Sequence, residues 1–173
     1  EGTALATEHL VKQGMQSIVL IAGPENTHVF KERSNAYLEV MKSHALTPSI
    51  YTGLSTYYAG FQLGTHLFEE RGGQRIDAVM AGSDYQSLGI LHAIQKSGRK
   101  VPEDVSLVSL NDTFLTAMSV PALTSVSYPL YRMGARAFET LFEDMQGVKP
   151  ENKTELFKPV LTFRQSTTEG GQA

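Results

Sequence analysis

The sequence has no cysteine among its 173 residues. That absence excludes a disulfide-stabilised scaffold, a thiolate zinc site and a cysteine nucleophile, and it fits a reducing compartment. An excess of positive charge is also lacking, because 15 lysine and arginine residues stand against 18 aspartate and glutamate residues, for a formal net charge of −3. Since no basic run could follow the phosphate backbone of DNA, we do not expect this chain alone to bind DNA.

Long apolar runs are missing as well. No stretch approaches the roughly 20 apolar residues that a membrane helix needs, and the opening EGTALATEHLVKQG lacks the basic start and apolar stretch of a signal peptide. We therefore expect a soluble chain without a membrane partner, whose 41% hydrophobic content suffices for one domain or one large lobe. The chain begins at Glu1, in or just before an expected helix, so we expect a fragment of a longer protein.

Two hydrophobic periods alternate along the chain. Short runs such as SIVLIAG and VSLVSL are apolar throughout and have strand length, whereas the segments between them place apolar residues on one helical face. We expect strands within residues 17–23, 48–53, 76–82 and 105–110, and helices within 1–13, 30–44, 57–70, 85–98 and 130–146. This alternation predicts an α/β fold with a parallel sheet covered by helices on both faces.

Several element boundaries can also be predicted. Asp84 is a candidate cap for the helix that follows it, and Gly72 and Gly73 are expected to end the helix before it. The tail after Arg164, QSTTEGGQA, is expected to be a frayed terminus.

The turns that follow the expected strands are small and polar. They read AGPENTHVFKER, TGLSTYY, AGSDYQS and SLNDTFLT. In a parallel sheet such turns gather at the carboxyl ends of the strands, where their hydroxyls, amides and carboxylates suit a polyhydroxylated ligand. The sequence contains no GxGxxG, GxxxxGK[ST], GxSxG or HExxH motif, and its five histidines are scattered, so we expect no phosphate cradle, catalytic site, metal or cofactor.

An ordered set of longer segments carries a family resemblance. These are ALATEHLVKQG, IVLIAGP, DAVMAGSDYQSLGILHAIQKSGRKVPEDVSLVSLND, PALTSV, MGARAF and FRQST. Over Gly2 to Thr167 the sequence resembles the effector-binding region of the lactose-repressor family of bacterial transcription regulators. The resemblance implies a type I periplasmic-binding-protein-like fold of two lobes with a ligand cleft between them, preceded by a helix-turn-helix segment that this chain lacks.

The resemblance also divides the chain between lobes. Residues 1–14 would be a helix of an amino-terminal lobe that is otherwise mostly absent, and 15–124 would form the carboxyl-terminal lobe. Residues 125–147 would be a crossover strand and helix of the amino-terminal lobe, and 148–173 would be return strands and the tail. We expect the two outlying helices to lack their partner sheet, which would leave part of the later helix exposed at Met133, Ala137, Phe138, Leu141, Phe142 and Met145. The chain would then either associate through these helices, with itself or with a missing lobe, or refold them onto its own core.

Seven effector-binding residues follow from the resemblance: Thr27, Val29, Arg33, Ser55, Ser83, Asn111 and Tyr128. Arg33 would hold ligand oxygens with its planar guanidinium, and Asn111 stands where many members have an aspartate that accepts bonds from sugar hydroxyls. Val29 replaces what is often a hydroxyl residue, and Ser55 replaces what is in several members a stacking aromatic. Asp112 is expected to fix its turn through backbone hydrogen bonds.

Each of these assignments has a structural alternative. Arg33 could be a solvated helix arginine paired with Glu32 or Glu39, Asn111 an ordinary turn residue, and Tyr128 a core residue. The apolar stripe of Leu88, Leu91 and Ile94 is expected to be core first and a homodimer face second.

The function implied is that of a ligand-sensing domain in a cytoplasmic transcriptional repressor. It would bind a small sugar or related polyol and control operator binding through the absent helix-turn-helix segment. The alternative is a secreted sugar-binding protein of a transport system, and an enzyme is the weakest class because Asp84 and Asp112 lack a visible base, metal set or nucleophile.

Overall fold

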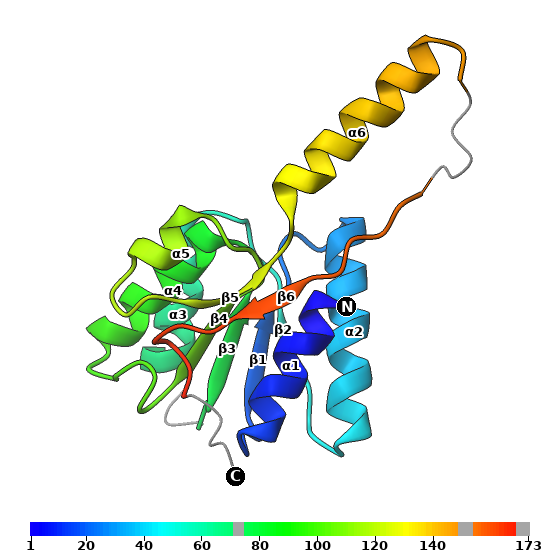
Figure 1. Cartoon of the computed structure of the whole chain (residues 1–173). Coiled ribbons are helices and arrows are strands. Elements are labelled where there is room, and N and C mark those ends of the chain that lie inside the picture. Colours follow the sequence, from blue (N-terminus) through cyan, green and yellow to red (C-terminus); the bar gives the residue numbers. More distant parts are fainter. Residues whose placement is uncertain (71–74, 149–153, 169–173) are drawn as a thin grey trace.

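The computed structural model describes residues 1–70, 75–148 and 154–168. Within these residues six strands form one sheet in the order β2-β1-β3-β4-β5-β6 (Figure 1). Neighbouring strands are parallel except β6, which runs antiparallel to β5. The strands are β1 (Ile18–Ile21), β2 (Ser49–Tyr51), β3 (Ala78–Ala81), β4 (Ser106–Ser109), β5 (Thr124–Ser127) and β6 (Val160–Thr162).

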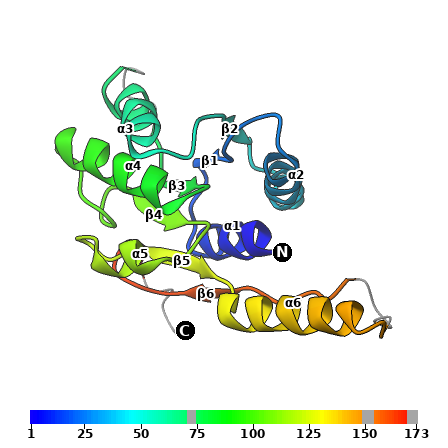
Figure 2. The ribbon, with the colours of Figure 1, turned by 90° about the horizontal axis from the view of Figure 1, so that it is seen from above.

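Helices cover both faces of this sheet, as Figure 2 shows from above. They are α1 (Gly2–Lys12), α2 (His28–Ser43), α3 (Tyr57–Thr65) with a π-helical turn η1 (His66–Glu70), α4 (Asp84–Lys96), α5 (Phe114–Met118) and α6 (Leu130–Met145). Helices α1 and α2 lie on one side, and α3 and α4 lie on the other. The predicted α/β class and parallel sheet are therefore confirmed, whereas the expected helix end at Gly72 and Gly73 lies outside the described residues.

The two faces of the sheet contribute to separate cores. In β1, which is apolar at every position, Val19 and Ile21 belong to the cluster on the α3–α4 side, and Ile18 and Leu20 belong to the cluster on the α1–α2 side. Successive side chains of a strand point to opposite faces, so a strand between two cores is buried on both. Strand β4 is buried in the same way although it contains two serines, and Ser109 is satisfied there by hydrogen bonds with Ser87 and Asp84.

Helices α3 and α4 approach each other closely at two glycines. A Cβ atom on Gly60 would lie 2.2 Å from the carbonyl oxygen of Gln86, and one on Gly89 would lie 2.1 Å from the carbonyl oxygen of Tyr57. Any larger residue at either position would push the two helices apart, so these glycines set the helix spacing.

The first helix packs differently from what the resemblance implied. Ala6 and Leu10 of α1 are completely buried in a cluster with Ile18, Leu20 and Val126 of this chain's own sheet. Helix α1 therefore packs on this chain's own core, which is the second of the two expected outcomes, and the sheet described here supplies the partner that was expected to be missing.

Strand β5 and the tail are also part of this sheet layer. Thr124 and Ser125 pair with Val108 and Ser109 of β4, so the strand expected to cross into another lobe begins inside this sheet. In the tail, the Ser166 hydroxyl accepts from Thr124 N at 2.8 Å, and Ser166 is fully buried. The expectation of a tail frayed from residue 165 is wrong for these residues, because backbone and side-chain hydrogen bonds hold them against β4 and β5.

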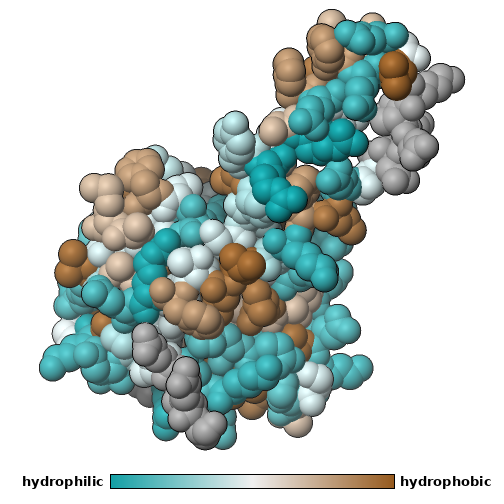
Figure 3. All heavy atoms as spheres, viewed as in Figure 1, coloured by the Kyte–Doolittle hydropathy of each residue, from teal (hydrophilic) through white to brown (hydrophobic). Residues whose placement is uncertain are grey.

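Helix α6 projects from the body as an arm (Figures 1 and 2). None of the described residues of α6 is buried. The space-filling view shows apolar and polar atoms side by side along this arm (Figure 3). Its exposed apolar side chains are Leu130, Tyr131, Met133, Phe138, Leu141, Phe142 and Met145, which confirms the exposure predicted for this helix.

Candidate functional site

The candidate site lies where the parallel strands end and the next helices begin. Helices α2, α3, α4 and α5 start at this edge, and each is capped by a side-chain hydroxyl. Thr27 accepts from Phe30 N at 3.1 Å, Thr56 accepts from Ala59 N at 3.2 Å, and Ser83 accepts from Gln86 N at 3.2 Å. The positive ends of the helix dipoles therefore face the same edge of the sheet.

Arg33 reaches from α2 across this edge to the ends of two strands. Its Nη1 donates to the carbonyl oxygen of Gly82 at 2.8 Å, just after β3, and its Nη2 donates to Asn111 Oδ1 at 3.4 Å, just after β4. A Cβ atom on Gly82 would lie 2.8 Å from Arg33 Nη1, so the glycine leaves the room that the guanidinium occupies. The structure thus brings together two of the predicted residues that stand 78 positions apart in sequence.

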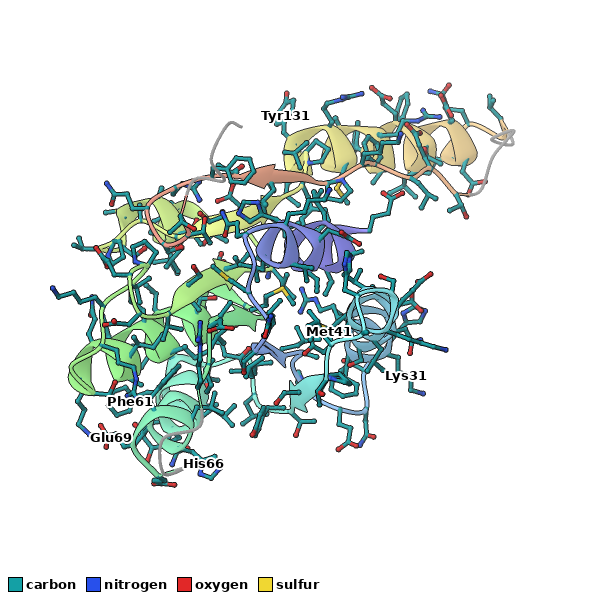
Figure 4. The ribbon with its side chains drawn as sticks, turned by 90° about the horizontal axis from the view of Figure 1, so that it is seen from below. Lys31, Met41, Phe61, His66, Glu69 and Tyr131 are labelled. Atoms are coloured by element: carbon teal, nitrogen blue, oxygen red, sulfur yellow. The ribbon has the colours of Figure 1, made fainter. Side chains whose placement is uncertain are left out.

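The alternative reading of Arg33 as a solvated helix residue does not fit. Among the described residues Arg33 forms no ion pair with Glu32 or Glu39. Burial lowers the pKa of the Arg33 guanidinium, and the nearby Tyr128 side chain opposes that shift. Lys31 shows the contrast, since it lies on the outer side of α2 while Met41 of the same helix points toward the sheet (Figure 4).

A groove of about 370 Å³ runs along α2 beside this arginine. Arg33, Val29 and Tyr128 line it, and Val29 is 53% exposed. Tyr128 also packs against the core cluster under α1, as its structural alternative predicts, and its contact with a ligand stays a prediction. The groove residues that were not predicted include His28, Asn35 and Glu39. With Glu32 they recur at i, i+4, i+7 and i+11 on one face of α2, and this spacing was the signal that could have found them.

Not all predicted residues meet in this groove. Ser55 is exposed in the loop after β2. It lies close to the turn after β1, because a Cβ atom on Gly23 would be 3.8 Å from Ser55 Oγ. The Thr27 hydroxyl already donates to Pro24 O at 2.8 Å while it caps α2. Contact of Thr27, Ser55 and Ser83 with a ligand stays a prediction.

Asp112 is a structural centre, although not through backbone bonds as expected. Its carboxylate accepts from Thr116 Oγ1 at 2.8 Å, Ser125 Oγ at 2.7 Å, Ser127 Oγ at 2.6 Å and Arg164 Nη2 at 2.8 Å. Burial raises the pKa of Asp112, but the three hydroxyls and Arg164 outweigh it and lower the pKa to about 2. The carboxylate therefore ties the turn after β4 to β5 and to the return segment.

Asp84 is likewise engaged inside the fold. Its side chain accepts from Ser109 Oγ at 2.5 Å and from Thr113 N at 2.8 Å, and only 3% of the residue is exposed. The prediction that Asp84 caps α4 is wrong, because Ser83 is the N-cap and Asp84 is the first residue of the helix. Neither aspartate is free to act as a base or to hold a ligand.

A larger cavity, of about 650 Å³, lies at the opposite end of the strands near Gln16, Thr47 and Arg75. Its one carboxylate, Asp77, already accepts from Gln16 N and Ser17 N and pairs with Arg75. The amino-end cavity thus lacks the converging free donors of the carboxyl edge, which makes the smaller groove the better candidate.

The comparisons with known proteins agree with this architecture. Residues 7–167 match the family described as periplasmic binding protein-like domain. Catabolite control protein A of Staphylococcus epidermidis is 32% identical over 165 residues, which are 94% of this chain and 49% of that protein. The ribose operon repressor of Halalkalibacterium halodurans is 30% identical over 171 residues, which are 99% of this chain and 51% of that protein.

Solved structures give the same result. A transcriptional regulator CelR–cellobiose complex superposes with a TM-score of 0.87 at 30% identity, covering 95% of this chain and 51% of that one. A dimeric lac repressor with an 11-residue C-terminal deletion superposes with a TM-score of 0.89 at 28% identity, covering 96% and 60% of the two chains.

A periplasmic-binding-protein-like fold is thus established for this chain. Within that class it belongs to the lactose-repressor family, to which the ribose operon repressor and the lac repressor named above also belong. The chain spans about half the length of the curated relatives it matches. Across the described residues, no helix has both the length and the apolar character needed to span a bilayer.

Proposed function

We propose that this chain is part of the effector-sensing domain of a bacterial transcriptional repressor. It binds a small hydroxylated molecule, such as a sugar, and controls operator binding by a helix-turn-helix segment outside this chain. The observation that carries the proposal is the Arg33 guanidinium joined to Gly82 and Asn111 at the ends of β3 and β4. A fork of fixed donors beside an amide is suited to orienting a ligand rich in oxygen.

Binding is favoured over catalysis by the state of the acidic residues. Asp84 and Asp112 each accept several hydrogen bonds from the protein, so neither has the freedom of a general base or a nucleophile. Relatives such as the ribose operon repressor support a regulator that acts on DNA in the cytoplasm over a secreted sugar-binding protein.

We also propose a homodimer as the working form, since a solved lac repressor relative is described as dimeric. Leu91 and Ile94 cannot form its interface because they are buried in this chain's own core. The exposed side of α3 and α4 is the better candidate for the dimer interface. There the Tyr57 hydroxyl and His92 Nδ1 form a hydrogen bond of 2.8 Å, and Tyr85 is 60% exposed.

The effector proposal is tested by thermal-shift screening of the intact regulator against sugars, sugar phosphates and nucleosides. A ligand that binds only the folded state raises its melting temperature. A compound that does so should also change operator affinity in a gel-shift titration. Stabilisation without any effect on operator binding would contradict a sensing role.

A further inference from the structure

The Arg33 guanidinium is a half-buried positive charge without a negative partner in the described part of the chain. Its hydrogen bonds go to the Gly82 carbonyl and to the Asn111 amide, which are both neutral groups. No ion pair formed by the described residues includes Arg33. Since an uncompensated charge removed from water costs free energy, this corner of the groove favours an occupant that brings a negative charge.

The carboxylates nearest in sequence to the strand ends do not supply that charge. Asp112 is paired with Arg164 at 2.8 Å, and Asp84 is held by Ser109 and Thr113 N. At position 111, where an aspartate would neutralise Arg33, the chain has an amide. Asn111 turns its Oδ1 toward Arg33, so its Nδ2 protons remain available to donate to an anion.

The acidic residues of the groove lie along α2 rather than at this corner. Glu39 is six residues beyond Arg33, which corresponds to about 9 Å along the helix. Glu32 is exposed and makes no ion pair with Arg33 in the described structure, and Glu1 lines the groove without such a pair as well. The groove is therefore polarised, with the positive charge of Arg33 at the strand ends and negative charges along its flank.

We propose that the effector carries an anionic group, a carboxylate or a phosphate, which binds Arg33 and the Asn111 amide. The uncharged hydroxylated part of the effector lies along the groove beside Val29 and Tyr128. This inference rests on the proposed sensing function and narrows its ligand class from polyols to acidic polyols. The positive ends of α2 and α4, which begin at Thr27 and Ser83, add to the preference for an anion.

The test uses the ¹⁵N-labelled 173-residue chain, titrated with glucose, glucuronate, glucose 6-phosphate and inorganic phosphate at constant ionic strength. Amide chemical shifts detect binding even when the affinity is low. We expect saturable shifts at Gly82, Ser83 and Asn111 with the acidic probes and none with glucose. A response to glucuronate alone identifies a carboxylate, and a response to both phosphate compounds identifies a phosphate.

Two variants and a control isolate the charge. Asn111→Asp and Arg33→Gln should each weaken binding of the acidic probe at least about tenfold, because each removes a charge-assisted interaction with the anion. Lys31→Gln removes the same charge from the outer side of the same helix and should leave the affinity unchanged.

Two results would overturn the inference. One is glucose binding at these amides as tightly as its acidic counterparts, and the other is no saturable shift with any of the acidic probes. After either result, the proposed sensing function still holds if a neutral compound stabilises the intact regulator and changes its affinity for the operator. If compounds that stabilise the intact regulator leave its operator affinity unchanged, the proposed function itself is contradicted.

Discussion

Replacing Asp112 by asparagine should destabilise the fold, and the loss should disappear in acid. The carboxylate accepts hydrogen bonds from Thr116, Ser125, Ser127 and Arg164, and the side chain is only 11% exposed. An asparagine amide keeps the size but presents N–H groups to some of these donors. It also leaves Arg164, whose side chain is 19% exposed, without its negative partner.

The magnitude follows from the lowered pKa. A carboxyl group with a pKa of 3.8 when unfolded and about 2 when folded gives roughly 2 kcal/mol of stability at neutral pH. Because the site lies near the surface, solvent screening reduces this to about 1–2 kcal/mol. The folded pKa is the lower one, so the contribution is fully present above pH 3.8 and is lost as the pH falls toward about 2.

Urea unfolding followed by circular dichroism at several pH values measures this directly. At pH 7 the variant should unfold with a free energy lower by about 1–2 kcal/mol, and the gap to wild type should close between pH 4 and about pH 2. Asp144→Asn, on the exposed arm of α6, is the matched control and should change little at either pH. A pH-independent gap, or one no larger than that of the control, would refute the assignment of Asp112 as the charged centre of this network.

The remaining predictions concern the site, the helix pair and the arm. In the intact regulator, Arg33→Ala should raise the effector dissociation constant by at least about tenfold with the melting temperature retained, and unchanged affinity in calorimetry would remove Arg33 from the site. Gly89→Ala should cost about 1–3 kcal/mol in urea unfolding, because its Cβ would lie 2.1 Å from Tyr57 O, whereas Gly134→Ala on the open face of α6 should cost nothing. The exposed apolar residues of α6 should make the chain associate at rising concentration in light scattering, and Phe138→Ser should reduce that association, so a monomer at all concentrations would contradict it.

The sequence was sufficient to predict strands β1 to β4, five of the helices and their alternation, whereas β5 and β6 were expected only from the resemblance and α5 was not predicted. The signal was strongest where a strand is buried on both faces and apolar at every position, as in Ile18–Ile21. The residues at the strand ends could also be predicted, since parallel strands place their carboxyl ends at one edge of the sheet. That rule alone brings the turn of Asn111 close to the turn of Gly82.

Side-chain partners could not be predicted in the same way. Asp84 and Ser83 are adjacent, and both residue types cap helices, so only the orientation of Ser83 decides which one does. For Asp112 no sequence pattern indicated Arg164, which stands 52 positions away and reaches it from the segment after β6. Pairings of this kind depend on the fold as a whole.

Helices α1 and α6 show what the periodicity of apolar residues does not predict. Both have an apolar face, and that face predicts burial without identifying the surface that covers it. Leu10 of α1 is covered by this chain's sheet, whereas Phe138 of α6 is 68% exposed. Only two connections join α6 to the sheet, one through Tyr128 and Pro129 and the other through the residues before β6. Tyr128 also lines the groove beside Arg33, so one of the two segments that join α6 to the sheet contacts the candidate site.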